Sequence, residues 1–125
     1  MSGARAEVEA TLIRYFDALY ESDADALADV MHPRAVYATA DEPEPLIRSM
    51  EEYLPIVAAR QAPSARGEAR KDLIESVDIS GSNTALARVR CSIGSRDFVD
   101  FLSLIRTEAG WRIIAKVFHF KEQEL

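Results

Sequence analysis

Residues 96–120, RDFVDFLSLIRTEAGWRIIAKVFHF, decide the fold class because their pattern describes two neighbouring strands. Side chains alternate between the two faces of a strand, so one face of the first strand carries Phe98, Asp100, Leu102 and Leu104. The short break Glu108-Ala109-Gly110 separates the two segments and is typical of a hairpin turn. We therefore predict antiparallel strands over 96–107 and 111–120.

Two more segments with a period of two precede this hairpin, at 70–80 and 84–93. The turn signals Gly81-Ser82-Asn83 and Gly94-Ser95 separate them from each other and from the hairpin. The second half of the chain is therefore predicted to form an antiparallel meander.

The first part of the chain has helical periodicity instead. An apolar stripe along a first helix consists of Val8, Leu12, Tyr15, Phe16 and Leu19. Ser22, with Asp25 three residues later, predicts the N-cap of a short second helix that ends before Pro33. The side chains that this second helix is expected to bury are Leu27, Val30 and Met31.

An extended segment is predicted between the second and third helices. Residues 35–40 have the composition of a short strand, and 41–45 are predicted to form a loop because two prolines remove backbone donors. Ser49 with Glu52 repeats the capping spacing and begins a third helix. Pro55 lies inside that helix and should kink it or delay its start.

Helices followed by a meander indicate an α+β domain, with the helices packed on one face of a mainly antiparallel sheet. The 125 residues suit a single domain, 1–125, that can bury one core. A net charge of -6 argues against nucleic acid and anionic membrane lipid as partners. The single cysteine, Cys91, excludes an internal disulfide, and the absence of a signal-peptide pattern favours a cytoplasmic protein.

This order of segments resembles the nuclear transport factor 2-like superfamily. The strings that carry the resemblance are RYFDAL (14–19), SDADAL (22–27), MHPRAV (31–36), DFLSLIR (100–106) and GWRIIAKVFH (110–119). The last two strings, together with Glu51-Glu52-Tyr53, are most similar to the branch named "putative lumazine-binding", or SnoaL-like. The resemblance implies a cone-shaped, cystatin-like fold, in which three N-terminal helices and a curved sheet enclose a pocket. Members of this superfamily include isomerases, cyclases and dehydratases as well as non-catalytic binding modules, so the resemblance in fold does not by itself give the function.

The ketosteroid isomerases of this superfamily use a helix tyrosine, a carboxylate base and a protonated aspartic acid. Tyr15 matches the position of the tyrosine. The position of the base falls on Thr39 and that of the acid on Leu102, and neither side chain can perform the role. The resemblance therefore does not extend to ketosteroid isomerisation.

Asp100 is the main candidate for acid–base chemistry or for contacting a polar ligand. Its neighbours on the same strand face are apolar, and a partly desolvated carboxylate suits either task. The alternative is a structural ion pair with Arg88, Arg90 or Lys116 on adjacent strands.

The last strand offers further candidate residues. In a regular strand Trp111 and His119 share one face and Lys116 lies on the other, so only one of His119 and Lys116 can point into the pocket unless a β-bulge intervenes. His119 would act as a proton shuttle and Lys116 as a cationic contact for an anionic ligand. A surface or interface role is the alternative for both. Tyr15, Tyr37, Tyr53 and Trp111 are the aromatic candidates for lining the pocket, with Tyr15 and Tyr53 preferred because a buried hydroxyl needs a partner.

Three functions fit these observations. The first is a domain that binds a small apolar or aromatic molecule. A cofactor-free isomerase, cyclase or dehydratase with Asp100 or His119 as its acid–base group is the second, and an interaction module is the third. We expect no cofactor and no metal, because spacings such as His-x-x-x-His are missing. Helices cover only one side of the predicted sheet, so we also expect a homodimer through the open sheet face.

Overall fold

The computed structural model describes residues 3–123 as helices packed on one curved sheet. The helices are α1 (Gly3–Glu21), α2 (Ala24–Val30), α3 (Met50–Ala59) and the short 3-10 helix η1 (Ser64–Arg66). The strands are β1 (Met31–Thr39), β2 (Leu46–Ser49), β3 (Asp72–Ser80), β4 (Thr84–Ile93), β5 (Arg96–Thr107) and β6 (Gly110–Glu122). Their order in the sheet is β2-β1-β6-β5-β4-β3, and the β1–β6 pair alone is parallel among the described pairs. The predicted α+β class is confirmed.

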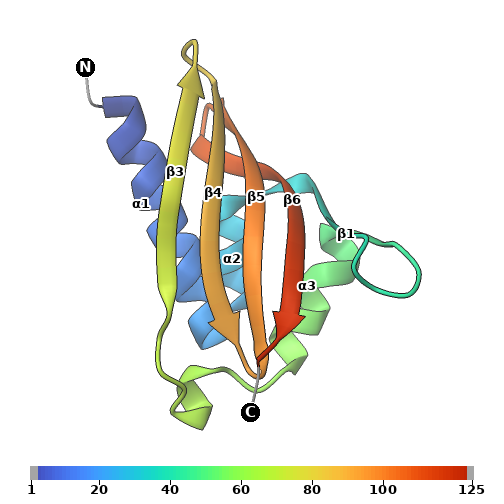
Figure 1. The fold of residues 1–125 in the computed structure, drawn as a ribbon. Coiled ribbons are helices and arrows are strands. Elements are labelled where there is room, and N and C mark those ends of the chain that lie inside the picture. Colours follow the sequence, from blue (N-terminus) through green and yellow to red (C-terminus); the bar gives the residue numbers. More distant parts are fainter. Residues whose placement is uncertain (1–2, 124–125) are drawn as a thin grey trace.

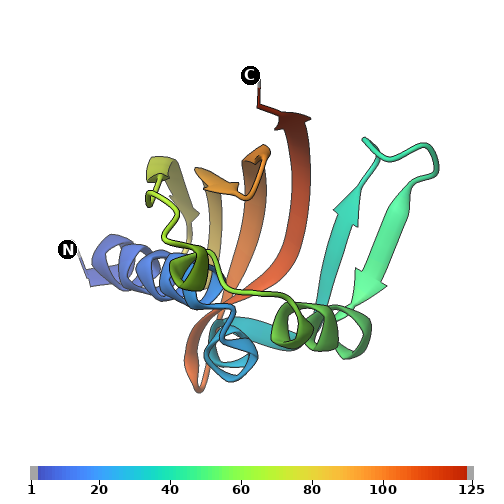
Figure 2. The ribbon, with the colours of Figure 1, turned by 90° about the horizontal axis from the view of Figure 1, so that it is seen from below.

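The sheet has one face covered by helices and one face without them. In Figure 1 the helices lie behind β3–β6, and the front of these strands carries no other element. Seen from below, the β1–β2 hairpin bends away from β3–β6, with α3 beneath it (Figure 2). This curvature produces the cone that the family resemblance implies. We call the covered side the inner face and the other side the outer face.

The first helix agrees with the prediction, but the start of the second does not. Every residue of the predicted α1 stripe is buried. Ser22 does not cap α2: its φ is 47°, in the left-handed region, and its N–H donates to the Leu19 carbonyl at 3.2 Å to end α1. Asp23 is the N-cap instead, because its side chain accepts a hydrogen bond from Ala26 N at 3.0 Å.

The third helix begins where the capping signal predicts. The Ser49 hydroxyl accepts from Glu52 N at 3.2 Å, and the Glu52 carboxylate accepts from Ser49 N at 3.0 Å. Pro55 lies inside α3 and does not delay its start. Its missing N–H leaves the Glu51 carbonyl without an intrahelical partner, on a part of the helix that is exposed to water.

The β1–β2 hairpin differs from the prediction. β1 begins at Met31 rather than at residue 35, so Met31 is buried from a strand and not from the second helix. Pro33 lies where the pairing with β6 is interrupted, between Met31 and Val36, so its missing N–H removes no ladder hydrogen bond there. The four-residue strand β2 was not predicted, because a segment this short after two prolines has no readable alternation.

The last strand contains a β-bulge that decides which side chains face inward. The β5–β6 register shifts between Ser103 and Leu104, so that Ile114 is an extra residue in β6. Trp111 before the bulge and Lys116 after it are consequently both buried. Within residues 3–123, no helix is long and apolar enough to cross a membrane.

Candidate ligand-binding site

The inner face of β5 and β6 carries a buried polar group formed by Tyr15, Asp100 and Lys116. Asp100 is completely buried, and its Oδ2 accepts a hydrogen bond from the Tyr15 hydroxyl at 2.7 Å. The Lys116 ammonium lies 3.9 Å from the same oxygen and is 4% exposed. Asp100 is therefore paired with Lys116, whereas Arg88 and Arg90 both bind Glu75 on the outer face. α1, β5 and β6 each contribute one member of this group.

Four aromatic rings surround the Lys116 ammonium. The distances from Nζ to the ring centroids are 5.3 Å for Tyr15, 5.4 Å for Tyr37, 5.8 Å for Tyr53 and 5.4 Å for Phe118. These distances lie within the range of cation–π attraction, which is strongest for a desolvated cation. The rings and Asp100 together offset part of the cost of burying this charge.

The electrostatics of the group keep both Lys116 and Tyr15 protonated. Burial by itself lowers the pKa of Lys116, but the Asp100 carboxylate together with Tyr53, Cys91 and Tyr37 raises it by more, so the net pKa is raised. Burial, followed by the Asp100 charge, also raises the pKa of Tyr15 well above its usual value. The phenol is therefore a hydrogen-bond donor and the lysine a permanent cation near neutral pH.

Two polar atoms of this group are left without hydrogen-bond partners. Asp100 Oδ1 is buried and accepts no hydrogen bond from the described residues. Lys116 Nζ makes no hydrogen bond with the described residues, and its contact with Asp100 is an ion pair at 3.9 Å. A buried polar atom without a partner costs free energy, so a donor at Oδ1 would be stabilising; an acceptor could also bind the Lys116 ammonium. Neither Asp100 nor Lys116 lines any surface pocket that we describe for residues 3–123.

A wall of aromatic rings leads from this group to the open end of the cone. Tyr37 stacks on Tyr53 with a centroid distance of 4.2 Å, and Phe118 is 4.8 Å from Tyr37. Phe98 lies 5.8 Å from Phe118 and 6.1 Å from Phe120. We call these five residues the aromatic wall.

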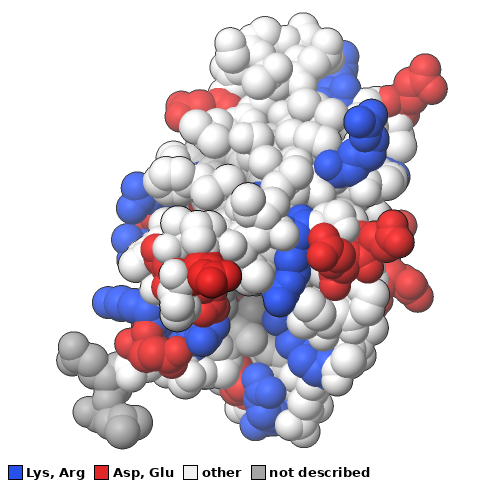
Figure 3. Space-filling view, turned by 90° about the vertical axis from the view of Figure 1, so that its right-hand side faces the viewer, with Lys and Arg blue, Asp and Glu red and all other residues white. Residues whose placement is uncertain are grey.

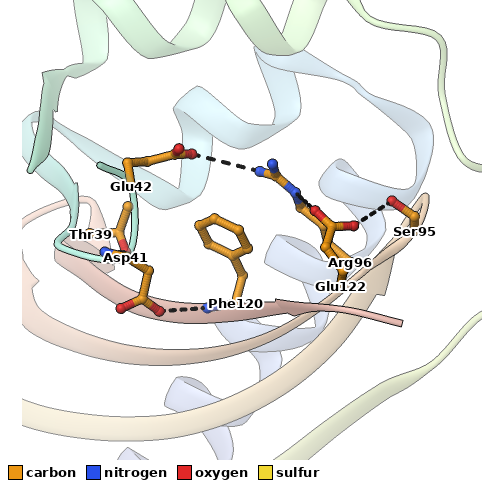
Figure 4. A network of polar contacts seen from close by, with 7 residues as sticks. All are labelled: Thr39, Asp41, Glu42, Ser95, Arg96, Phe120 and Glu122. Atoms are coloured by element: carbon orange, nitrogen blue, oxygen red, sulfur yellow. Dashed lines mark hydrogen bonds and ion pairs between the residues drawn. The ribbon is translucent and has the colours of Figure 1, made fainter. Parts of the chain in front are cut away.

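The rim of the cone is tied together by Arg96. Its Nε donates to Glu122 at 2.9 Å, and its Nη1 is 3.8 Å from Glu42 in the loop after β1. The guanidinium also lies 4.2 Å from the Phe120 ring centroid. Figure 4 shows Phe120 between Glu42 on one side and Arg96 on the other. Arg96 therefore links the β1–β2 loop to the ends of β5 and β6 beside the aromatic wall.

A second contact holds the same loop. Asp41 accepts a hydrogen bond from Phe120 N at 3.2 Å and is paired with the His119 ring (Figure 4 draws the contact with Phe120). The Thr39 hydroxyl accepts from Asp41 N at 3.1 Å. These contacts lower the pKa of Asp41, first through the hydrogen bond with His119 and then through the one with Phe120. Thr39 is thus a structural residue of the loop, in the position where an isomerase base would stand.

The structure brings some candidate residues together and separates others. Tyr15, Tyr53, Asp100 and Lys116 form one group, and their roles in binding or catalysis stay predictions. His119 points outward, with 63% of its side chain exposed, so it cannot act with Asp100 on one substrate. Trp111 is buried at the other end of the cone, where its Nε1 donates to Glu7 at 3.3 Å.

Sequence reasoning passed over several members of the site. Phe98, Phe118 and Phe120 belong to the aromatic wall, and Arg96 to its rim. The face shared by Lys116, Phe118 and Phe120 was readable from alternation, but the bulge at Ile114 was not. Because the bulge could not be predicted, alternation alone did not show whether the face of Lys116 or the face of Trp111 points inward.

The other sequence candidates have structural roles. Cys91 is buried, and burial first and then Asp100 raise the pKa of its thiol to about 12, which leaves little thiolate. His32 is the second residue of β1, and its Nδ1 accepts a hydrogen bond from Arg34 N at 3.0 Å. Residues 3–123 contain no cluster of His, Cys, Asp and Glu that could hold a metal ion.

The family described as "Putative lumazine-binding" matches residues 3–119. The chain belongs to this family. The match covers both the helices and the sheet, including all members of the group around Lys116. A search of functionally curated proteins returns no match.

Solved structures with the same fold include proteins described as being of unknown function. An NTF2-like protein of unknown function from Silicibacter pomeroyi has a TM-score of 0.85 and 24% identity, covering 96% of this chain and 98% of that one. Another from Shewanella baltica has a TM-score of 0.84 and 20% identity, covering 95% and 94%. A ketosteroid isomerase-like protein from Erwinia carotovora atroseptica has a TM-score of 0.68 and 15% identity, covering 90% and 92%. These likenesses establish the nuclear transport factor 2-like fold and nothing more specific.

Proposed function

We propose that this protein binds a small planar molecule at the open end of the cone, between the aromatic wall and the Lys116 ammonium. The observation that carries the proposal is a permanent cation that is held inside the fold with no hydrogen-bond acceptor in the described residues. Binding pockets are typically apolar with a few convergent polar groups, and the aromatic wall with Lys116 and Asp100 fits that description.

The unpartnered atoms suggest which ligand chemistry would fit. Lys116 Nζ offers a donor and Asp100 Oδ1 an acceptor, so a matching ligand carries an acceptor next to a donor along one edge. The edge of a lactam or imide ring has this pattern, and a lumazine ring offers such an edge. The flat body of the ligand would stack on Tyr37, which is half-buried, after the Arg96–Glu42 contact opens.

The test compares an aromatic-wall variant with a matched outer-face variant. Lumazine, a pterin, a flavin and a polyketide-like acid are titrated into the protein by calorimetry and by thermal shift, since a true ligand raises the melting temperature. Tyr37→Leu should weaken binding by about tenfold, the value of one aromatic stacking contact. Phe101→Leu, on the outer face, should leave affinity unchanged. Equal affinities in both variants, or no binding of any probe, would overturn the proposal.

A cofactor-free isomerase, cyclase or dehydratase is the alternative function at the same site. It is favoured by the geometry of Asp100, which keeps one free oxygen while the Tyr15 hydroxyl donates to the other at 2.7 Å. Of the two acid–base candidates, Asp100 lies on the inner face and His119 on the outer. Exchange of ligand C–H protons for deuterium in D2O, abolished by Asp100→Asn, would establish catalysis; binding without exchange would favour a binding domain.

We also propose a homodimer through the outer face. Leu86, Phe101 and Val117 are 48%, 51% and 52% exposed; Phe101 is paired with Val117, and Leu86 is paired with Ser103, the next residue of β5 on the same face. Contiguous exposed apolar side chains on a sheet are typical of an interface, and two-fold pairing is the commonest arrangement. Light scattering should give twice the chain mass, and Phe101→Arg should give a monomer. Ile13→Arg, at an exposed apolar position on α1, is the control that should remain dimeric.

A further inference from the structure

The outer face also carries a pocket, which shares Phe98 and no other residue with the aromatic wall. Its volume is about 640 Å³, within the range of small-molecule sites. It lies where β4 and β6 end and β3 and β5 begin, at the lower end of the sheet in Figure 1. The lining residues that matter here are Lys71, Leu73, Arg88, Arg90, Val99 and Lys121.

Strand register explains why these side chains converge. Arg90 is paired with Leu73 on one side and with Val99 on the other, so the three form one row across β3, β4 and β5. The next row, closer to the strand ends, pairs Asp97 with Lys121. Side chains of paired residues lie on the same face, and the two rows therefore produce a basic rim around an apolar floor.

The two arginines are held in place by one carboxylate. Glu75 accepts from Arg88 Nε at 2.8 Å, and its other oxygen is 3.0 Å from Arg90 Nε. Arg88 also lies 5.5 Å from the Phe101 ring centroid. Each guanidinium thus uses only its Nε in these pairs, which leaves its terminal Nη groups available. Two fixed guanidinium groups with free N–H donors are suited to an oxyanion.

The acidic residues near the pocket are already engaged. Asp97 accepts hydrogen bonds from Ser92 Oγ at 2.6 Å and from Gln123 Nε2 at 3.0 Å, and Asp72 is paired with Arg70 at 2.7 Å. Lys71 and Lys121, in contrast, have no carboxylate within 4.0 Å among residues 3–123. The pocket therefore has spare positive charge in a protein whose net charge is -6.

We propose that this outer-face pocket binds a phosphomonoester. The free Nη groups of Arg88 and Arg90, with Lys71 and Lys121, would contact the phosphate oxygens, while Leu73 and Val99 contact the organic part. A dianion with three terminal oxygens can use several of these donors at once, which a single carboxylate cannot.

The surrounding surface favours a small anion over a nucleic acid. On the side of the molecule that Figure 3 presents, basic and acidic side chains are interleaved in the lower half, and uncharged atoms fill much of the upper half. A long polyanion would meet these carboxylates, and an extended basic track is what nucleic-acid binding requires. The net charge of -6 likewise argues against a long polyanion as the ligand.

The experiment uses 4-nitrophenyl phosphate, inorganic phosphate and 4-nitrophenol as probes. Calorimetry and NMR shift mapping are performed on the full chain at low salt. We expect the aryl phosphate to bind most tightly, inorganic phosphate more weakly, and the uncharged phenol not at all. Resonances of Val99 should move, and the affinity should fall as salt concentration rises.

Variants on the exposed rim decide the assignment. Arg90→Gln and Lys121→Gln should each weaken binding of the aryl phosphate by about tenfold, the value of one charge-assisted hydrogen bond. Arg106→Gln is the matched control, since Arg106 is bonded to Asn83 at the opposite end of the sheet and should have no effect. Absence of binding at millimolar phosphate ester, or equal losses in all three variants, would overturn the proposal.

Discussion

Replacement of Lys116 by methionine tests whether the buried ion pair holds the site together. The substitution keeps most of the side-chain volume and the contacts with the four rings, but it removes the positive charge. Asp100, which is 0% exposed, would then be a buried carboxylate with Tyr15 as its only remaining described partner. We therefore expect the folded state to lose stability although packing is preserved.

The expected loss follows from the burial of both partners. Removing one member of a buried ion pair costs about 3–5 kcal/mol, because the other charge is left uncompensated. Domains of this size have a total stability of about 5–15 kcal/mol, so the variant should remain folded but with a much lower denaturation midpoint. Lys121→Met, at an exposed position of the same strand, should change the stability by less than about 0.5 kcal/mol.

Urea unfolding followed by tryptophan fluorescence measures these free energies, since the only tryptophan, Trp111, is buried in the core. A double-mutant cycle with Asp100→Asn isolates the interaction. The loss of stability in the double variant should be about 2 kcal/mol smaller than the sum of the losses in the two single variants. A loss below about 1 kcal/mol for Lys116→Met, or strict additivity in the cycle, would show that the pair does not carry the charge compensation that we assign to it.

Three further predictions concern the same fold. Burial lowers the pKa of Lys116, but Asp100, Tyr53, Cys91 and Tyr37 together raise it above its usual value, and burial and Asp100 raise the pKa of Tyr15. Both groups therefore bind protons more tightly when folded, and their stabilisation should be complete below about pH 10 and decline at higher pH. Unfolding free energies measured between pH 8 and 11 should fall less steeply in Tyr15→Phe, and an identical slope would contradict this account. Ser49→Ala removes the hydroxyl that caps α3 and should cost about 1 kcal/mol in urea unfolding, whereas Ser80→Ala on the exposed end of β3 should cost almost nothing. The Cys91 thiol, with its pKa of about 12 and its burial, should react with a disulfide reagent only as fast as the protein opens, and a rapid reaction under native conditions would contradict its place in the core.

The sequence predicted the local structure where short-range physics decides it. The α1 stripe, the Ser49 cap and the three glycine-containing turns of the meander are all present, because helical spacing, capping and left-handed glycines act over a few residues. Ser22 was misjudged because the end of α1 and the start of α2 compete for the same residues. β2 was not predicted because its four residues are too few to show a clear alternation, and its pairing with β1 across a loop has no signal in the local sequence.

The last two strands show which part of the site follows from the sequence alone. Alternation along 96–107 placed Asp100 on the inner face, and the structure bears this out because β5 is regular there. The partner of Asp100 depended on the bulge at Ile114, which turns Lys116 to the same side as Trp111 and leaves His119 outside. A bulge is a mismatch between two strands rather than a property of either one. Tertiary structure alone therefore decided that a lysine in an aromatic cage, and not a histidine, faces the buried carboxylate.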